Sequence, residues 1–153
     1  MKIGGIVEQR HLTLYSIASI KNKPGSVAEV LSAFAIERIN LAYITEAVDK
    51  EGNAVLSFCV DYDDKDKVDL VIKNKTRVIS RHISKIENVG MVGIYGPHFR
   101  EKPAIAMRLF DVLGKAKINI LGISSSISTI SCVVDIQELD SAKEALLSYF
   151  ELP

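Results

Sequence analysis

The sequence predicts an α+β fold of two similar units, each with helices on one face of an antiparallel sheet. The chain has 153 residues, 48% of them hydrophobic, so it can bury a core as one compact domain or two small ones. Residues 22–34 and residues 101–113 share one pattern: a short polar loop, a proline and a helical apolar face. A strand-like run lies before and after each of these stretches, so one plan is used twice.

A fixed offset aligns the two halves of the chain. Pro24 aligns with Pro103 and Asn40 with Asn119, because 103 − 24 and 119 − 40 both give 79. Proline is tolerated in the first helical turn, where its missing N–H has no partner, so both prolines predict helix starts. The same offset matches apolar positions on one helical face: Val30, Leu31 and Phe34 with Leu109, Phe110 and Leu113.

The first unit contains a hairpin, because the turn Glu51-Gly52-Asn53 leads into an alternating apolar run. The unit is predicted to begin with a strand over His11–Ser19, followed by a helix from Pro24. Two strands follow, over Asn40–Val48 and Ala54–Val60. A second helix over Lys65–Lys73 and a closing strand over Thr76–Ile83 complete the unit.

The second unit repeats this plan and then runs out of chain. Its elements after Pro103 follow the same order, with a shorter turn near Ser126 and an amphipathic last helix. Little chain remains after Phe150, which leaves a sheet edge open. Lys2–Glu8 has no role in the first unit, so we expect it to pair with the second. Its predicted strands are Met91–Gly96, Asn119–Ser126 and Ser128–Asp135, and its predicted last helix is Ser141–Phe150.

Each unit therefore has the order of a ferredoxin-like βαββαβ unit. We expect the first to comprise residues 10–86. The second is discontinuous and comprises residues 1–9 with residues 87–153.

Composition argues against several classes of partner, with a local basic patch left as an open alternative. Lysine plus arginine and aspartate plus glutamate each number 19, so no net charge draws the chain to nucleic acid or an anionic membrane. No apolar run approaches the roughly 20 residues that span a bilayer, and the N-terminus lacks the apolar core of a signal peptide. We expect a cytoplasmic protein. Cys59 and Cys132 lie in strand-like apolar runs, which favours buried thiols over a disulfide.

Residues of the types that catalyse reactions or bind metals are scattered along the sequence. His11, His82 and His98 lie far apart in the sequence, and there is no Cys-x-x-Cys pair, nucleophile elbow, P-loop or Gly-x-Gly-x-x-Gly. The acidic run Asp61–Asp69 lacks the central glycine and closing glutamate of a calcium loop, so we expect a solvated helix start. The serines of Ser124–Ser131 are expected in strands and a turn or in contact with a ligand. We therefore expect no catalytic site, cofactor or metal.

The loop before the first helix is the best candidate site. Unpaired N–H groups at a helix start suit a carboxylate, and Gly25 lets a ligand approach the backbone. Asn40, Thr45 and Glu46 begin and line the adjacent strand, where Glu46 suits an ammonium group. The alternative is that Asn-Lys-Pro-Gly is only a good turn and Glu46 an exposed strand residue. Ala104 replaces the glycine in the second copy, so that helix start is less open.

Three segments resemble paired ACT domains, specifically the C-terminal regulatory region of aspartokinases. KIGGIVEQ (2–9) resembles the family's entry strand, and NKPGSVAEVLSAFAIERINLAYI (22–44) resembles its first ACT motif. GIYGPHFREKPAIAMRLFDVLGKAKINILGISSSISTISCVVD (93–135) resembles the second motif, with the family's order and spacing. The resemblance extends over essentially the whole chain.

This resemblance implies an allosteric module rather than an enzyme. ACT pairs bind free amino acids, and in aspartokinases lysine or threonine bound there inhibits phosphorylation of aspartate. The resemblance also implies a homodimer and a kinase catalytic domain or subunit as partner. A stand-alone amino-acid sensor and a dimerisation module acting on another enzyme or regulator are the alternatives. The expected ligand-binding residues are Asn22, Lys23, Pro24, Gly25, Ser26, Val27, Asn40, Ile44, Thr45, Glu46, Asn119, Ile120 and Ser124.

Four residues differ from those usual in the family. Asn22 and Ala42 stand where aspartates are common, Glu46 where a glutamine is common, and Ile127 where an acidic residue usually follows the serines. Because buried polar groups of a site reject ligands that cannot pair with them, such exchanges change which amino acid fits or abolish binding.

Overall fold

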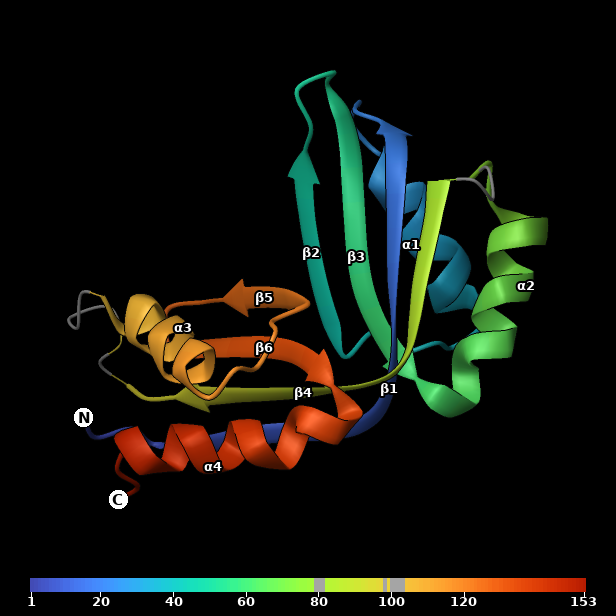
Figure 1. Ribbon diagram of the computed structural model, residues 1–153. Helices are drawn as coiled ribbons and strands as arrows, with labels where there is room; N and C mark the ends of the chain where they lie inside the picture. The colour runs from blue at the N-terminus through green and yellow to red at the C-terminus, as the bar shows by residue number, and fades with distance from the viewer. Residues whose placement is uncertain (79–81, 98, 100–103) are drawn as a thin grey trace. The chain divides into compact units, whose positions relative to one another are not determined.

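The computed structural model describes residues 1–78, 82–97, 99 and 104–153. Strands and helices are mixed in the order expected, which confirms the α+β class (Figure 1). The elements are β1 (Gly5–Lys21), α1 (Ser26–Ile36), β2 (Tyr43–Val48), β3 (Asn53–Asp61), η1 (Tyr62–Asp64), α2 (Lys65–Lys75), β4 (Ile83–Tyr95), α3 (Ile105–Lys115), β5 (Gly122–Ser125), β6 (Thr129–Asp135), η4 (Ile136–Glu138) and α4 (Leu139–Tyr149).

The chain divides into two compact units. One is Leu12–Glu87, and the other is Met1–His11 together with Asn88–Pro153. Both boundaries lie inside long strands, so β1 and β4 each contribute to both units. At each boundary one residue has a left-handed backbone, His11 with φ 56° and Asn88 with φ 57°.

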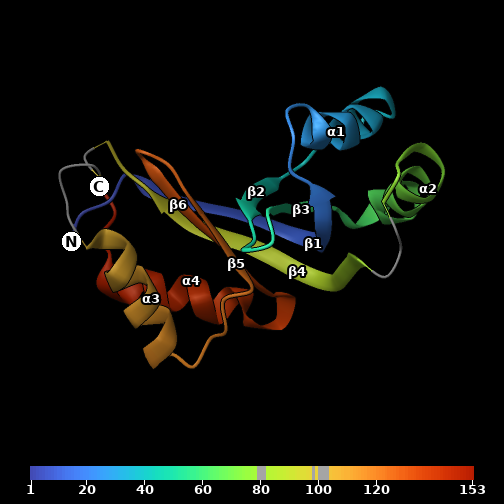
Figure 2. The same cartoon turned by 90° about the horizontal axis from the view of Figure 1, so that it is seen from above.

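The Leu12–Glu87 unit packs α1 and α2 on one face of its strands. β3 lies between β2 and β1. In the strand register, Phe58 of β3 is opposite Tyr15 of β1 on one side and Ile44 of β2 on the other. Phe58 stacks on Tyr15 at 5.4 Å between ring centroids and meets Phe34 of α1 at 5.1 Å. The Tyr15 hydroxyl donates to Asp69 of α2 at 2.7 Å. Figure 2 shows the two helices side by side.

The Met1–His11 and Asn88–Pro153 unit has the same helix-on-sheet plan. β6 pairs with β4 and β5, and its buried Ile130, Cys132 and Val134 pack in one core with residues of α3 and α4. The N-terminal segment joins this core: Gly4 N donates to Tyr95 O at 2.6 Å and Ile3 N to Glu151 O at 2.9 Å. The N-terminal segment thus lies with this second unit.

Ion pairs hold the N-terminal strand on α4 in the same unit. Lys143 Nζ lies 2.9 Å from Glu8, and Arg10 Nε lies 2.6 Å from the other carboxylate oxygen of Glu8. Arg10 also pairs with Asp140. The hydrogen bonds from Lys143 and Arg10 lower the pKa of Glu8, so its carboxylate stays ionised in the folded protein.

Some predicted boundaries are wrong. Pro24 does not occupy the first turn, because α1 begins at Ser26 after a turn that contains Pro24 and Gly25. Thr76–Ile83 is not a strand at its start, since Thr76 ends α2 and β4 begins at Ile83. Residues 79–81 of that prediction, and Pro103 and His98, lie outside the described residues.

Buried thiols are confirmed. Cys59 and Cys132 are unpaired and fully buried. Burial raises the pKa of each thiol to about 12, because the thiolate would lose its solvation. The acidic run begins a helix as expected, with Asp61 accepting a hydrogen bond from Asp63 N at 3.0 Å. Across the described ranges, none of the helices has the length and apolar character needed to cross a bilayer.

Candidate functional site

The loop before α1 is exposed and has a left-handed glycine. Gly25 has φ 87° and is the N-cap, where no side chain supplies a capping hydrogen bond. Ser26 N donates to Lys23 O at 3.1 Å, and Glu29 N to Gly25 O at 2.9 Å. Among the described residues, none accepts a hydrogen bond from the N–H groups of Val27 and Ala28. This helix start can therefore accept a carboxylate or water.

The adjacent strand β2 presents its candidate residues on two faces. Glu46 pairs with Leu56 and Ile44 with Phe58, so both lie on the face that α1 and α2 cover. Thr45 pairs with Ser57 on the opposite face. Glu46 is exposed, and β2 is the edge strand. Only one face of β2 can therefore contribute side chains to a common site with α1.

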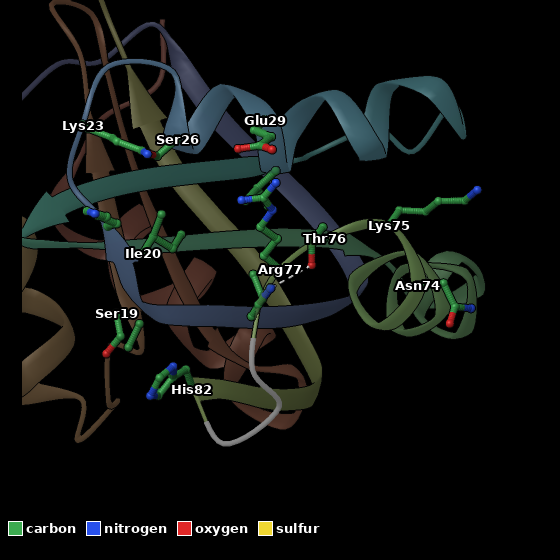
Figure 3. A pocket seen from close by; sticks show the side chains of 14 residues that line it. Ser19, Ile20, Lys23, Ser26, Glu29, Asn74, Lys75, Thr76, Arg77 and His82 are labelled. Atoms are coloured by element: carbon green, nitrogen blue, oxygen red, sulfur yellow. Dashed lines mark hydrogen bonds between the residues drawn. The ribbon is translucent and has the colours of Figure 1, made fainter.

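A cavity of about 550 Å³ lies in the Leu12–Glu87 unit, between the end of β1, the first turns of α1 and the residues that end α2. Lys23 and Ser26 are the predicted site residues that line it. Asn22, Pro24, Gly25, Val27, Asn40, Ile44, Thr45 and Glu46 do not line it. We call it the α1–α2 cavity (Figure 3).

Sequence reasoning missed the far wall of this cavity. Asn74–Val78 and His82 form it, at a place where a strand was expected. Lysines near the end of a helix are ordinary, because they offset the negative end of its dipole. Lys75 and Arg77 therefore gave no signal in the sequence, and their place opposite Lys23 depends on how α1 and α2 pack.

The second copy of the loop lies in the other unit. Ala104 is the N-cap of α3 and, like Gly25, has a left-handed backbone, with φ 66°. Asn119 is exposed, and Ile120 packs against the core. Ser124 is half-buried and pairs with Ser131. The roles of Asn119, Ile120 and Ser124 in ligand binding stay predictions.

The sequence is similar to known proteins over both units. The family model described as ACT domain matches residues 92–150. The aspartokinase of Helicobacter pylori (strain ATCC 700392 / 26695) is 27% identical over 156 residues, which cover 98% of this chain and 37% of that protein. This chain thus spans little more than a third of the length of the curated relatives that it matches.

Solved structures share the fold. The regulatory subunit of aspartate kinase from Thermus thermophilus, in ligand-free form, has a TM-score of 0.84 and 19% identity, and the match covers 99% of this chain and 100% of that one. Aspartokinase III of E. coli in complex with lysine and aspartate (T-state) has a TM-score of 0.73 and 18% identity, with 95% of this chain and 32% of that one covered. At these identities the structural likeness establishes the fold.

Proposed function

We propose that this chain is a regulatory module without catalytic activity of its own. Residues 92–150 match the ACT-domain family, and 98% of the chain is related in sequence to aspartokinases. It binds a free amino acid and controls an aspartate kinase in the biosynthesis of aspartate-derived amino acids. The observation that carries the proposal is the match of this chain, nearly end to end, to just over a third of an aspartokinase.

The loop before α1 suits the carboxylate of an amino acid. Gly25 has no side chain that would block approach, and the N–H groups of Val27 and Ala28 are available to donate hydrogen bonds to a carboxylate. Glu46 on β2 suits the ammonium group or a cationic side chain. Lysine and threonine are the first candidates, and the lysine complex of the E. coli protein supports lysine.

Regulation follows from linkage between binding and conformation. An effector that binds one conformation better shifts the population toward it, and coupling of this kind is typically about 1–3 kcal/mol. Without differential binding the kinase would not respond, however tightly the effector bound.

The partners follow from the same proposal. The chain forms a homodimer, and an aspartokinase catalytic domain or subunit is the target of regulation. The effector is the small molecule required, without a cofactor or metal. The protein is cytoplasmic and acts without nucleic acid or membrane.

A thermal-shift screen of the purified chain against the twenty amino acids tests this function. An effector at about 100 times its dissociation constant adds roughly 2.7 kcal/mol to stability. We expect lysine or threonine to raise the melting temperature, and Glu46→Gln to reduce that shift. Glu51→Gln, in the exposed turn of the same hairpin, is the matched control and keeps the full shift. A flat screen, repeated with the catalytic partner present, would contradict effector binding.

A dimerisation module with an inactive site is the second candidate. Asn22 stands where the family usually has an aspartate, and no side chain caps the start of α1. This candidate predicts a dimer that no amino acid stabilises. A stand-alone sensor would instead show an effector shift without any bound kinase, so co-purification separates it from the aspartokinase function.

A further inference from the structure

We propose that the α1–α2 cavity binds a small organic anion with two or more negative charges, a dicarboxylate or a phosphate monoester. This ligand differs from the proposed amino-acid effector. Its site shares Lys23 and Ser26 with the loop assigned to that effector, but its other walls, at the end of β1 and after α2, do not belong to that loop. The inference is argued from the cavity and not from the proposed function.

The cavity has the size and position of a small-molecule site. Its volume of about 550 Å³ falls in the usual range of roughly 300–1,000 Å³ for ligand cavities. The lining residues that the structure describes all belong to the Leu12–Glu87 unit. Its walls come from β1, α1 and the chain that ends α2, so one folded unit builds the site.

Positive charge is concentrated on the walls of this cavity. The chain as a whole has equal numbers of cationic and anionic residues, 19 of each. Among the described residues that line the cavity, by contrast, four have cationic side chains and one, Glu29, has a carboxylate. The four are Lys21, Lys23, Lys75 and Arg77. An anion of charge two or more would balance most of this excess.

These cations are not compensated within the protein. Elsewhere in the same unit Lys85 Nζ lies 2.7 Å from Asp69, and Lys65 Nζ lies 3.2 Å from Asp66. In the part of the chain that the structure describes, the four cavity cations form no such ion pair. Lys65 of α2 and Lys85 of β4 therefore have carboxylate partners, whereas the four cavity cations are available for a ligand.

Arg77 and Lys23 are best placed to bind the anion. Figure 3 shows Arg77 between Glu29 and His82 in the view, with Lys23 beside Ser26, whereas Lys75 extends away from the other cations. A guanidinium binds carboxylate or phosphate through two parallel hydrogen bonds, and an ammonium group adds a point charge. The Thr76 hydroxyl donates to Ile72 O at 2.6 Å, so it is already used by the backbone.

The same charges disfavour a cationic ligand. Free lysine would bring an extra positive charge among four others, so this cavity discriminates against lysine and in favour of dianions. The amide of Arg77, which lies outside the effector loop, should therefore not respond to lysine, whereas Ser26 belongs to both the loop and the cavity.

NMR titration of the ¹⁵N-labelled chain at low ionic strength tests the proposal, with succinate and inorganic phosphate as the probes. Acetate and chloride at matched ionic strength are the controls. We expect the amides of Ser26, Glu29 and Arg77 to shift with a dissociation constant of about 1 mM, since exposed charge pairs are individually weak. Arg77→Gln and Lys23→Gln should each weaken binding by at least about fivefold. Lys50→Gln, an exposed lysine away from the cavity, should leave it unchanged.

The outcomes separate cleanly. Binding of succinate alone identifies a dicarboxylate site, binding of phosphate alone a phosphate-ester site, and binding of both a general dianion site. Shifts equal to those with chloride, or equal affinity in all three variants, would overturn the proposal. The spectrum of each variant reports its fold, and Arg77→Lys provides a folded alternative that should retain partial binding. A response to lysine without any response to dianions would leave the effector function intact and reject this site.

Discussion

At the scale of single residues, Gly25 and Ala104 show how the two repeats differ. Both are N-caps with left-handed backbones, at φ 87° and φ 66°. Glycine adopts this conformation without steric penalty, whereas alanine is disfavoured there by roughly 1 kcal/mol. The second repeat therefore has the same left-handed backbone at Ala104 as the first has at Gly25, although alanine disfavours it.

Ala104→Gly should accordingly stabilise the protein by about 0.5–1 kcal/mol, and Gly25→Ala should destabilise it by a similar amount. Urea unfolding followed by circular dichroism measures both. Ala106→Gly, two residues further on in α3, is the matched control and should destabilise by about 1 kcal/mol, because glycine is a poor helix former. Loss of stability in Ala104→Gly equal to that in Ala106→Gly would show that the left-handed backbone carries no strain.

At the scale of elements, α1 and α3 end in the same way. Arg38 N donates to Ala35 O and Ile39 N to Phe34 O, both at 3.0 Å. In the second copy Lys117 N donates to Gly114 O at 2.9 Å and Ile118 N to Leu113 O at 3.0 Å. This is the Schellman pattern, with a buried isoleucine following the left-handed residue in each case.

Glycine usually holds the left-handed position of this pattern, but here Arg38 and Lys117 do, with φ 58° and φ 60°. Arg38→Gly and Lys117→Gly should each stabilise the protein by about 0.5–1 kcal/mol. Differential scanning calorimetry would register this as a higher melting temperature. Glu37→Gly, at φ −86°, is the control and should not stabilise. Two glycine variants that melt no higher than the parent protein would contradict the argument.

Periodicity predicted the helices and strands better than it predicted their ends. The run Ala54–Val60 was recognised as a strand because alternate residues are apolar, and β3 extends it by only one residue at each end. The start of β4 was misplaced, because Thr76–Ile83 contains β-branched residues that favour a strand while Thr76 in fact ends α2. Local preference cannot reveal where tertiary packing ends a helix.

The candidate site was predictable only in its local part. A polar loop with Pro24 and Gly25 before an apolar helix indicates an open helix start, and the structure has one. The cavity next to it joins α1 to the end of α2, about fifty residues away in the sequence. Nothing in the spacing of Lys23 and Arg77 indicates that they line one cavity, since only the packed helices bring them together.

At the scale of the whole molecule, the edge strands bear on assembly. In strand order β2 is one end strand and β5 the other, and β2 has six residues against four in β5. Ile44 is 43% exposed and Val48 51% exposed on β2. A long edge with exposed apolar side chains can pair with another chain, so β2 is the edge that we expect to join two copies.

We therefore expect the purified chain to sediment as a homodimer at micromolar concentration. Val48→Lys should shift it toward monomer, because a charged residue on an edge strand opposes pairing between sheets. Ile127→Lys is the matched control, since Ile127 is 69% exposed but lies in the turn between β5 and β6, and it should remain dimeric. Sedimentation velocity with and without lysine or threonine distinguishes these cases. A parent chain that stays monomeric in every condition would exclude effector sites between subunits and leave each chain to bind its ligand alone.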